Sequence, residues 1–252
     1  MKKIIKKEYN VYLIEQYYYP EAWGGVQLIR DISLIFKEDF KVTVVCGTRQ
    51  FVQGKEIGNF DPSKEGIKIF KIPSIFSKPR NFFERIIENL SFSFLSFIKI
   101  LFLEKPTFLF VQTNPPLNLI FFAFLSWIKG IPLVINAWDI YPDVLISHNS
   151  ALFKRLKFVF ILMNYIYKMA YKRARYVISL GRTMSQILLK KGVKENSIIE
   201  IPNWATGKLS SSKIIKNKFI KEWDVNSKLI IIYSGNCGVA HDYLSILKAL
   251  IS

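Results

Sequence analysis

Apolar positions recur along the chain with two periods, and segments of the two kinds alternate. Short runs rich in β-branched residues, such as 41–47 (KVTVVCG), are typical of buried strands. Longer stretches such as 25–38 place apolar residues three or four positions apart, which is typical of a helix with one buried face. The pattern predicts strands at 11–16, 41–47, 66–73, 107–113, 131–138, 175–180 and 196–203. It predicts helices at 25–38, 81–104, 114–130, 150–173 and 182–192.

Strands that alternate with helices predict an α/β fold, a doubly wound parallel sheet with helices on both faces. The seven strands complete one domain over residues 1–206, and the lysine-rich stretch 207–228 is typical of a linker. Residues 229–252 hold one more strand, a glycine-bearing turn and one helix. Because a lone strand and helix cannot bury their apolar faces, we expect them to be the incomplete start of a second domain.

The formal net charge of +17, from 36 lysines and arginines against 19 acidic residues, favours anionic partners. Nucleic acid, acidic lipid headgroups and phosphorylated small molecules fit this charge, although a lysine-rich coding composition would produce it as well. We expect no nucleic acid among the partners, because most aromatic residues lie within apolar helices rather than in a basic groove.

The cysteines and histidines limit the kinds of site that the sequence can form. Cys46 and Cys237 lie far apart without metal-ligand spacing, which argues against a disulfide framework and for a reducing compartment. His148 and His241 form no ligand cluster, so the sequence predicts no metal site. The common dinucleotide and P-loop glycine patterns are both absent.

The first candidate site is the loop YYYPEAWGGVQLI at 17–29, where a strand ends and Gly24 and Gly25 open a helix. Backbone amides at a helix N-terminus favour an anion, and paired glycines let a phosphate or a sugar approach the backbone closely. A plain tight turn is the structural alternative. The position at the carboxyl end of a strand favours a ligand, because open α/β sheets bind ligands there.

The second candidate site is NAWDIYPDV at 136–144, just beyond another strand. Asp139 in this position can hold a sugar hydroxyl or act as a general base, and Asp143 lies one helical turn further on. An Asx turn followed by a helix cap is an equally good structural explanation of these two residues.

Two further segments carry candidate residues. Asn203 lies in IPNW (201–204), which closes the last strand of the first domain and is by itself a simple domain-end turn. Gly235, Asn236 and Gly238 lie in YSGNCG, where a strand, a glycine-rich turn and a helix start follow in order. That order is a geometry that can cradle phosphate.

Five segments in one order, PEAWGG, NPPLN, AWDIYPD, IPNW and YSGNCG, carry a family resemblance. They resemble the N-terminal half of a GT-B glycosyltransferase of family 4, and the subgroup resembled builds O-antigen, capsule or colanic acid repeat units in bacteria. The resemblance extends from Tyr17 to about Leu250.

The resemblance implies an enzyme of two Rossmann-like domains that moves a sugar from a nucleotide-sugar donor to a lipid-linked acceptor. The first domain would be the acceptor side, Asp139 would be catalytic, and neither a cofactor nor a metal would be needed. The donor or acceptor would be bound by Gly24, Gly25, Asp143, Asn203, Gly235, Asn236 and Gly238. Two positions depart from the subgroup: Trp138 stands where arginine is usual, and Asp143 where glutamate is usual.

Most of a family nucleotide site would lie in the second domain, of which the sequence holds only the start. We therefore expect a truncated or split glycosyltransferase that is inactive as this chain alone, with a separate chain supplying the C-terminal half. The alternative is a non-catalytic module that binds a membrane or a partner and complements a separate donor-binding subunit.

A location at the inner face of the bacterial cytoplasmic membrane is expected from the resemblance and from two helices. The predicted helix at 81–104 is apolar and carries lysines, which fits a surface lying on an anionic membrane. The helix around 155–173 has a similar composition. Burial against the sheet is the alternative for both, and it is favoured for the second.

Overall fold

The computed structural model describes residues 9–19, 25–48, 62–76, 81–148, 157–205, 222, 231–232 and 243–251. The chain divides into two compact units, Met1–Thr206 and Gly207–Ser252. The second unit contains helix α9 (Tyr243–Ile251). The predicted linker at 207–228 and the strand that would begin a second domain lie almost entirely outside the described residues, so this division into domains stays a prediction.

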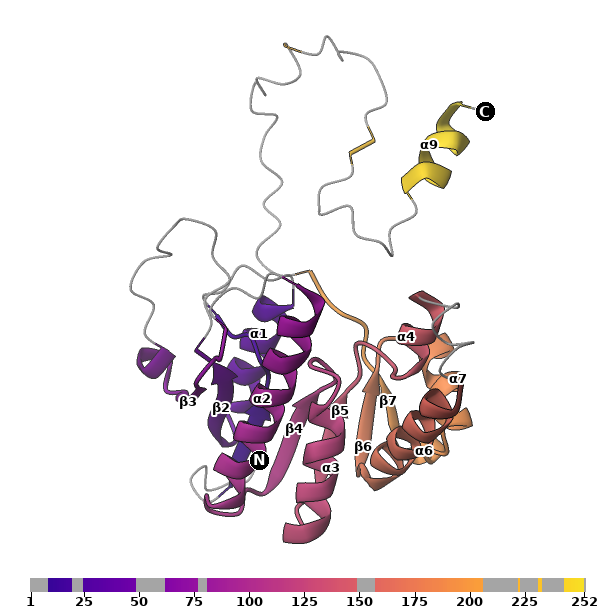
Figure 1. Cartoon of the computed structure of the whole chain (residues 1–252). Helices are drawn as coiled ribbons and strands as arrows, with labels where there is room; N and C mark the ends of the chain where they lie inside the picture. Colours follow the sequence, from indigo (N-terminus) through magenta and orange to yellow (C-terminus); the bar gives the residue numbers. More distant parts are fainter. Residues whose placement is uncertain are drawn as a thin grey trace. The chain divides into compact units, whose positions relative to one another are not determined.

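The first unit is built on one parallel sheet of seven strands (Figure 1). The strand order is β3-β2-β1-β4-β5-β6-β7, and every neighbouring pair is parallel. The α/β, doubly wound, Rossmann-like prediction is therefore confirmed. The strands are β1 (Asn10–Ile14), β2 (Lys41–Gly47), β3 (Lys68–Ile72), β4 (Phe108–Gln112), β5 (Leu133–Asn136), β6 (Tyr176–Ser179) and β7 (Ile198–Glu200).

The central strands are predominantly apolar, with polar residues at their ends, because both faces of the sheet are covered. In β1, Val11 and Leu13 face one apolar core, whereas Tyr12 and Ile14 face the other. The two cores explain why the strand sequences show no hydrophobic–polar alternation at the centre of the sheet.

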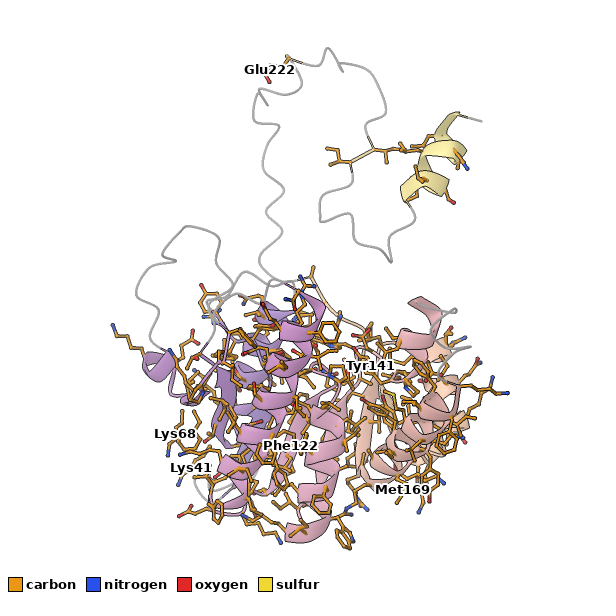
Figure 2. All side chains as sticks on the ribbon, in the orientation of Figure 1. Lys41, Lys68, Phe122, Tyr141, Met169 and Glu222 are labelled. Carbon is orange, nitrogen blue, oxygen red and sulfur yellow. The ribbon has the colours of Figure 1, made fainter. Side chains whose placement is uncertain are left out.

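Helices cover the two faces unequally. Helix α1 (Val26–Phe36) contributes to the smaller core, while α2 (Phe82–Leu101), α3 (Asn118–Lys129), α6 (Lys157–Arg173) and α7 (Arg182–Lys190) contribute to the larger one. Figure 2 labels Phe122 of α3, which is fully buried in the larger core. The short helix α4 (Asp143–His148) and the 3-10 turns η1 (Pro62–Glu65) and η2 (Glu195–Ser197) complete the described elements.

Local signals fix the ends of two long helices. The side chain of Asn81 accepts a hydrogen bond of 2.9 Å from the amide of Glu84 and so caps α2. Gly130 ends α3 with a φ of 59°, a left-handed conformation that glycine adopts without strain. The predicted helix at 114–130 is shorter at its start, because α3 begins at Asn118, after the two prolines. Within the described residues, no helix is both long and apolar enough to span a bilayer.

Candidate functional site

The sheet reverses its winding between β1 and β4, which are neighbours in space although β2 and β3 separate them in sequence. The carboxyl ends of these two strands and of β5 lie at one edge, which is where open α/β sheets bind ligands. Two of the sequence-predicted segments, the glycine loop and the Asp139 turn, begin at this edge.

The glycine loop and the Asp139 turn meet through Gly25 and Trp138. A Cβ atom placed on Gly25 would lie 2.5 Å from Cη2 of the Trp138 ring and closer still to Cζ3. Only a residue without a side chain therefore fits here beneath the indole. The tryptophan that departs from the family pattern is thus half-buried against the start of α1.

The Asp139 turn is hydrogen-bonded to Thr113, a fully buried residue directly after β4. Its hydroxyl oxygen accepts hydrogen bonds from the backbone amides of Trp138 (3.1 Å) and Asp139 (3.2 Å). One side chain therefore orients two consecutive residues of the turn. The sequence analysis missed Thr113, whose only signal was its position immediately after a buried strand.

Asp139 itself is half-buried and lies close to the phenol of Tyr141. Burial, with a smaller contribution from the nearby carboxylate of Asp139, raises the pKa of Tyr141 to about 12. The Tyr141 ring stacks against the Tyr167 ring of α6 at 6.0 Å, and burial also raises the pKa of Tyr167. The carboxylate of Asp139 consequently stands beside a phenol that remains protonated at neutral pH.

Two buried amide side chains lie at the same edge. Gln16 follows β1 and Gln112 ends β4, with exposed fractions of 2% and 0%. Both amide atoms of Gln112 and the Nε2 atom of Gln16 find no hydrogen-bond partner within the described part of the chain. Buried polar groups in native proteins are almost always paired, so the two amides are an unusual feature of this edge. Sequence reasoning missed both residues.

Asp143 has a different environment from Asp139. Its carboxylate forms an ion pair of 2.5 Å with Nζ of Lys191, a residue that is 4% exposed. The same ammonium donates a hydrogen bond of 3.0 Å to Oδ1 of Asn164 on α6. The pair ties the start of α4 to the end of α7 and to α6. Asp143 therefore has a structural partner, and its predicted role in ligand binding stays a prediction.

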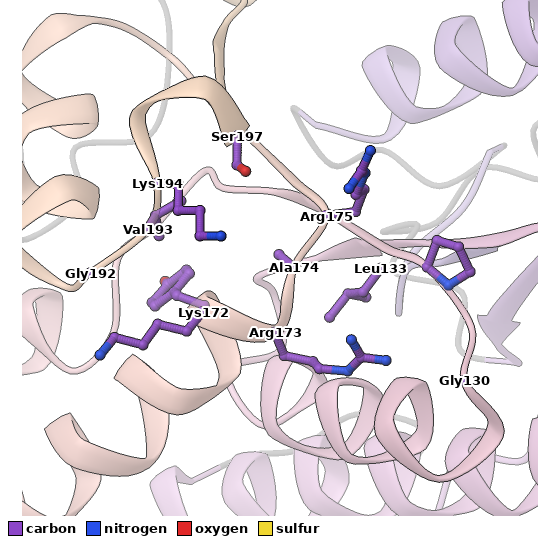
Figure 3. Close-up of a pocket in the computed structure, with 12 residues that line it drawn as sticks. Gly130, Leu133, Lys172, Arg173, Ala174, Arg175, Gly192, Val193, Lys194 and Ser197 are labelled. Carbon is purple, nitrogen blue, oxygen red and sulfur yellow. The ribbon is translucent and has the colours of Figure 1, made fainter.

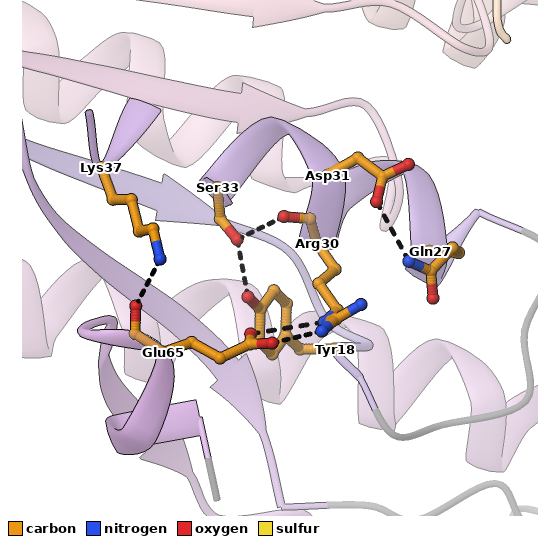
Figure 4. A network of polar contacts seen from close by, with 7 residues as sticks. All are labelled: Tyr18, Gln27, Arg30, Asp31, Ser33, Lys37 and Glu65. Atoms are coloured by element: carbon orange, nitrogen blue, oxygen red, sulfur yellow. Dashed lines mark hydrogen bonds and ion pairs between the residues drawn. The ribbon is translucent and has the colours of Figure 1, made fainter. Parts of the chain in front are cut away.

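Trp204 of the IPNW segment contacts α1. The indole Nε1–H of Trp204 donates to Oδ2 of Asp31 at 3.0 Å, and Oδ1 of Asp31 accepts from Gln27 at 3.0 Å. Figure 4 shows Gln27 and Asp31 on α1, the helix that the glycine loop opens. Asn203, the predicted site residue, is exposed next to this contact. The structure thus brings the IPNW segment to α1, the helix that follows the glycine loop.

The polar contacts on the inner side of α1 fix the tyrosines that precede the glycines (Figure 4). Tyr18 and Ser33 share a hydrogen bond of 2.7 Å between their hydroxyls, and burial raises the pKa of Tyr18 to about 12. Arg30 pairs with Glu65 and lies 4.7 Å from the centre of the Tyr19 ring. These contacts anchor the described part of the loop that ends at Tyr19.

Four predicted site residues lie outside the described residues: Gly24, Gly235, Asn236 and Gly238. The structure therefore brings together Gly25, Asp139 and their supports, and it places Asp143 in an ion pair and Asn203 on the surface. The roles assigned to all of these residues stay predictions.

The chain matches the protein-family model for Glycosyltransferase Family 4 over residues 24–205, which is more than half of its length. Among curated proteins it is 26% identical over 144 residues to a Pseudomonas aeruginosa protein with the name Probable glycosyltransferase WbjE. That match covers 55% of this chain and 34% of WbjE.

Among solved structures the chain is similar to Anabaena HepE in complex with UDP and glucose, with a TM-score of 0.48 and 16% identity. This similarity covers 86% of this chain and 51% of HepE. It is also similar to the lipopolysaccharide outer core galactosyltransferase WaaB in its apo form, with a TM-score of 0.43, 11% identity, and coverage of 80% and 47%. The chain spans about a third of the length of WbjE and about half of the length of these solved chains.

Proposed function

Because this chain belongs to glycosyltransferase family 4, we propose that it is the acceptor-side part of an enzyme of surface polysaccharide biosynthesis. That enzyme would move a sugar from a nucleotide-sugar to a lipid-linked acceptor. The observation that carries the proposal is the convergence of Gly25, Trp138 and Asp139 at the carboxyl edge of the sheet, where its winding reverses. A ligand bound there would meet a glycine backbone, an aromatic ring and a carboxylate.

In this proposal Asp139 accepts the proton of an acceptor hydroxyl. The hydroxyl oxygen forms the new bond to the anomeric carbon, and the bond from that carbon to the donor phosphate breaks as the nucleoside diphosphate leaves. Thr113 supports this role because it fixes the backbone on both sides of the Trp138–Asp139 peptide. The buried amides of Gln16 and Gln112 supply hydrogen-bonding groups for sugar hydroxyls.

The other predicted residues take supporting roles. The loop at Gly24 and Gly25 would lie against the donor phosphates or the transferred sugar, and Asn203 would lie near the hinge between two domains. Gly235, Asn236 and Gly238 would face the donor diphosphate from a second domain. Since the chain spans only part of its relatives' length, we assign the rest of the nucleotide site to a donor-binding domain beyond this chain.

We further propose that the enzyme works at the surface of an anionic membrane. Helix α3 packs between α2 and α6, and the outward sides of all three helices are apolar. On α3, Phe124 stacks on Trp127, which is 68% exposed, and Phe158 of α6 is 78% exposed. This exposed apolar surface consists of Phe83, Ile86, Ile87, Leu90, Phe94, Leu95, Phe124, Trp127, Ile128, Phe158, Val159, Ile161, Leu162, Tyr165, Ile166 and Met169.

A membrane fits this surface better than burial in the fold, because the same helices already bury a separate set of residues in the larger core. Patches of this extent on a soluble surface mark interaction sites. Exposed tryptophan and tyrosine suit the interface of a bilayer, and the net charge of +17 favours an anionic one.

The catalytic proposal is tested by transfer from radiolabelled nucleotide-sugars to a lipid-linked acceptor, with the chain supplied with a donor-binding domain. We expect no transfer by residues 1–252 alone, transfer in the presence of that domain, and a loss of roughly 100-fold or more for Asp139→Asn. Asp39→Asn, which alters an exposed carboxylate between α1 and β2 and outside the proposed chemistry, is the matched control. Full activity of Asp139→Asn would refute the catalytic role, and transfer by the chain alone would refute the need for a second domain.

The membrane proposal is tested by cosedimentation with vesicles of phosphatidylcholine and phosphatidylglycerol. The double variant Trp127→Ser/Phe158→Ser should lose binding. Ile35→Ser, which removes an exposed apolar residue of α1 on the opposite face, should retain it. Equal binding by the two variants would contradict the assignment of the surface. Vesicle binding without transfer under every condition would instead favour a non-catalytic module that complements a separate donor-binding subunit.

A further inference from the structure

A cavity of about 710 Å³ opens at the amino edge of the sheet, away from the carboxyl edge that carries the candidate site. It lies where α3 and α6 end and where β5, β6 and β7 begin. Figure 3 shows its lining, which comes from the Gly130 turn, the end of α6 with the turn that follows, and the loop before β7. The proposed transfer chemistry gives no role to this cavity.

The cavity is strongly cationic. Lys172, Arg173, Arg175 and Lys194 line it, and among the described residues that line it none has a carboxylate. Within the described part of the chain, no carboxylate lies within ion-pair distance of any of the four. Ser197 adds a hydroxyl to the lining. All four cations are exposed, so water and salt screen much of their mutual repulsion, and a bound anion would lower what remains.

Structural roles account for only part of this cluster. Arg173 donates a hydrogen bond of 2.9 Å to the carbonyl oxygen of Ser126, which joins the ends of α6 and α3. Lys172 and Arg173 also complement the negative end of the α6 dipole. Arg175 lies beyond the helix, with its guanidinium 5.7 Å from the centre of the Tyr176 ring. Neither helix contact covers Lys194, which comes from a different segment.

We propose that this cavity binds a phosphate-bearing group. Arginine presents a planar fork that matches phosphate oxygens, while lysine supplies a compact charge, and the cavity offers both. The phosphate could belong to the headgroup of an anionic lipid or to a small molecule in solution. The assignment to a lipid headgroup rests on the membrane proposal. Its support is that the exposed apolar surface on α3 and α6 continues towards the cavity.

The exposed apolar surface runs into the cavity. Met169, which Figure 2 labels on α6, is 56% exposed and lies one turn before Lys172 and Arg173. Trp127 lies one turn before Gly130 of the lining. A lipid whose acyl region touches this surface would therefore have its headgroup beside the cations.

The test compares two charge reversals of equal size in the full chain. Arg175→Glu/Lys194→Glu alters the cavity, and Lys41→Glu/Lys64→Glu alters two exposed lysines of β2 and η1, outside the cavity. Binding of inorganic phosphate is measured by calorimetry, and vesicle binding by cosedimentation with and without phosphatidylglycerol. Circular dichroism confirms folding, and Arg175→Gln/Lys194→Gln serves as a milder version if the first variant misfolds.

We expect the cavity variant to weaken phosphate binding at least about tenfold while the control variant binds like the unaltered chain. If phosphatidylglycerol vesicles show the same dependence and phosphate competes with them, the source is a lipid headgroup. If the cavity variant loses binding of soluble phosphate only, the source is a small molecule. The phosphate-binding proposal then holds even if no vesicle binds and the membrane proposal fails. Equal binding of both probes by the cavity and control variants would overturn the site.

Discussion

Gly25 and Trp138 lie in direct contact, with the indole ring occupying the space that a side chain at position 25 would need. One residue opens α1 and the other follows β5, so the contact joins two loops at the carboxyl edge of the sheet. It also explains why a large aromatic residue precedes Asp139. Five expectations follow from this arrangement and from its neighbours.

Gly25→Ala should destabilise the fold by about 1–3 kcal/mol, because the added methyl group overlaps the Trp138 ring. The backbone of Gly25 has a φ of −85°, which alanine adopts without strain, so the cost comes from the overlap alone. Urea unfolding in a double-mutant cycle with Trp138→Phe checks this. The smaller ring should reduce the cost of the alanine. An equal cost in both backgrounds would mean that the two residues do not touch.

Thr113→Val keeps the shape of the side chain but leaves the amides of Trp138 and Asp139 without their acceptor. We expect a loss of about 1–3 kcal/mol in the free energy of unfolding. In the complete enzyme a larger relative loss of transfer should accompany it, since Asp139 would no longer be oriented. Thr107→Val, at an exposed position before β4, should change neither quantity. If Thr113→Val is as stable as the unaltered chain, the hydroxyl of Thr113 does not stabilise the Asp139 turn.

Gln112→Met should raise stability by about 1–2 kcal/mol, because it replaces a buried amide that lacks a partner within the described residues. If the amide binds substrate, the same variant should raise the KM for the sugar substrate. Thermal melts and transfer kinetics measure the two effects, with the exposed Gln186→Met as the control. A Gln112→Met variant that is less stable than the original chain would show that the amide is satisfied after all.

Substitutions of Asp143 and Lys191 can show whether Asp143 has a structural role or binds a ligand. Asp143→Asn should cost about 1–3 kcal/mol, less than for a fully buried pair, because the Asp143 side chain is 47% exposed. Adding Lys191→Met should recover much of that loss, since no ammonium is then left buried without its carboxylate. If transfer returns along with stability, Asp143 acts only through this pair. If transfer stays low, Asp143 contacts a substrate.

The raised pKa of Tyr141 makes stability depend on alkaline pH. A folded pKa of about 12 above an ordinary value of 10.0 means that the folded state holds the phenolic proton more tightly. This contribution is therefore complete below pH 10 and is lost as the pH rises towards 12. Between pH 10 and pH 12, the free energy of unfolding should fall less for Tyr141→Phe than for the unaltered chain. Tyr165→Phe, at an exposed position, should behave like the unaltered chain. Parallel curves for Tyr141→Phe and the unaltered chain would contradict the pKa.

Much of the fold could be predicted because its signals are local. Segment 41–47 was predicted as a strand and is β2 without a change of bounds. Gly130 was predicted to end a helix and does so in the conformation that glycine favours. The alternation of strands and helices predicted a doubly wound parallel sheet, since crossovers between parallel strands leave few topologies.

The contacts that build the candidate site were not predictable, because they join residues that are distant in sequence. Trp138 was read as a departure from a family pattern, and its contact with Gly25 becomes visible only when β1 and β5 flank β4. Trp204 reaches Asp31 of α1 for the same reason. The partner of Asp143 is a buried lysine at the end of another helix, and no spacing in the sequence indicates that pair.

The place of β1 in the sheet has a consequence during synthesis. β1 is made first but pairs on one side with β4, which ends at Gln112. At about 5–20 residues per second, a ribosome needs on the order of 5–20 s to make the intervening chain. Throughout that time one edge of a strand that is almost entirely buried in the fold has no neighbour, so the nascent chain is exposed to aggregation until β4 emerges. The order that creates the ligand edge therefore also makes the growing chain a candidate for chaperone binding.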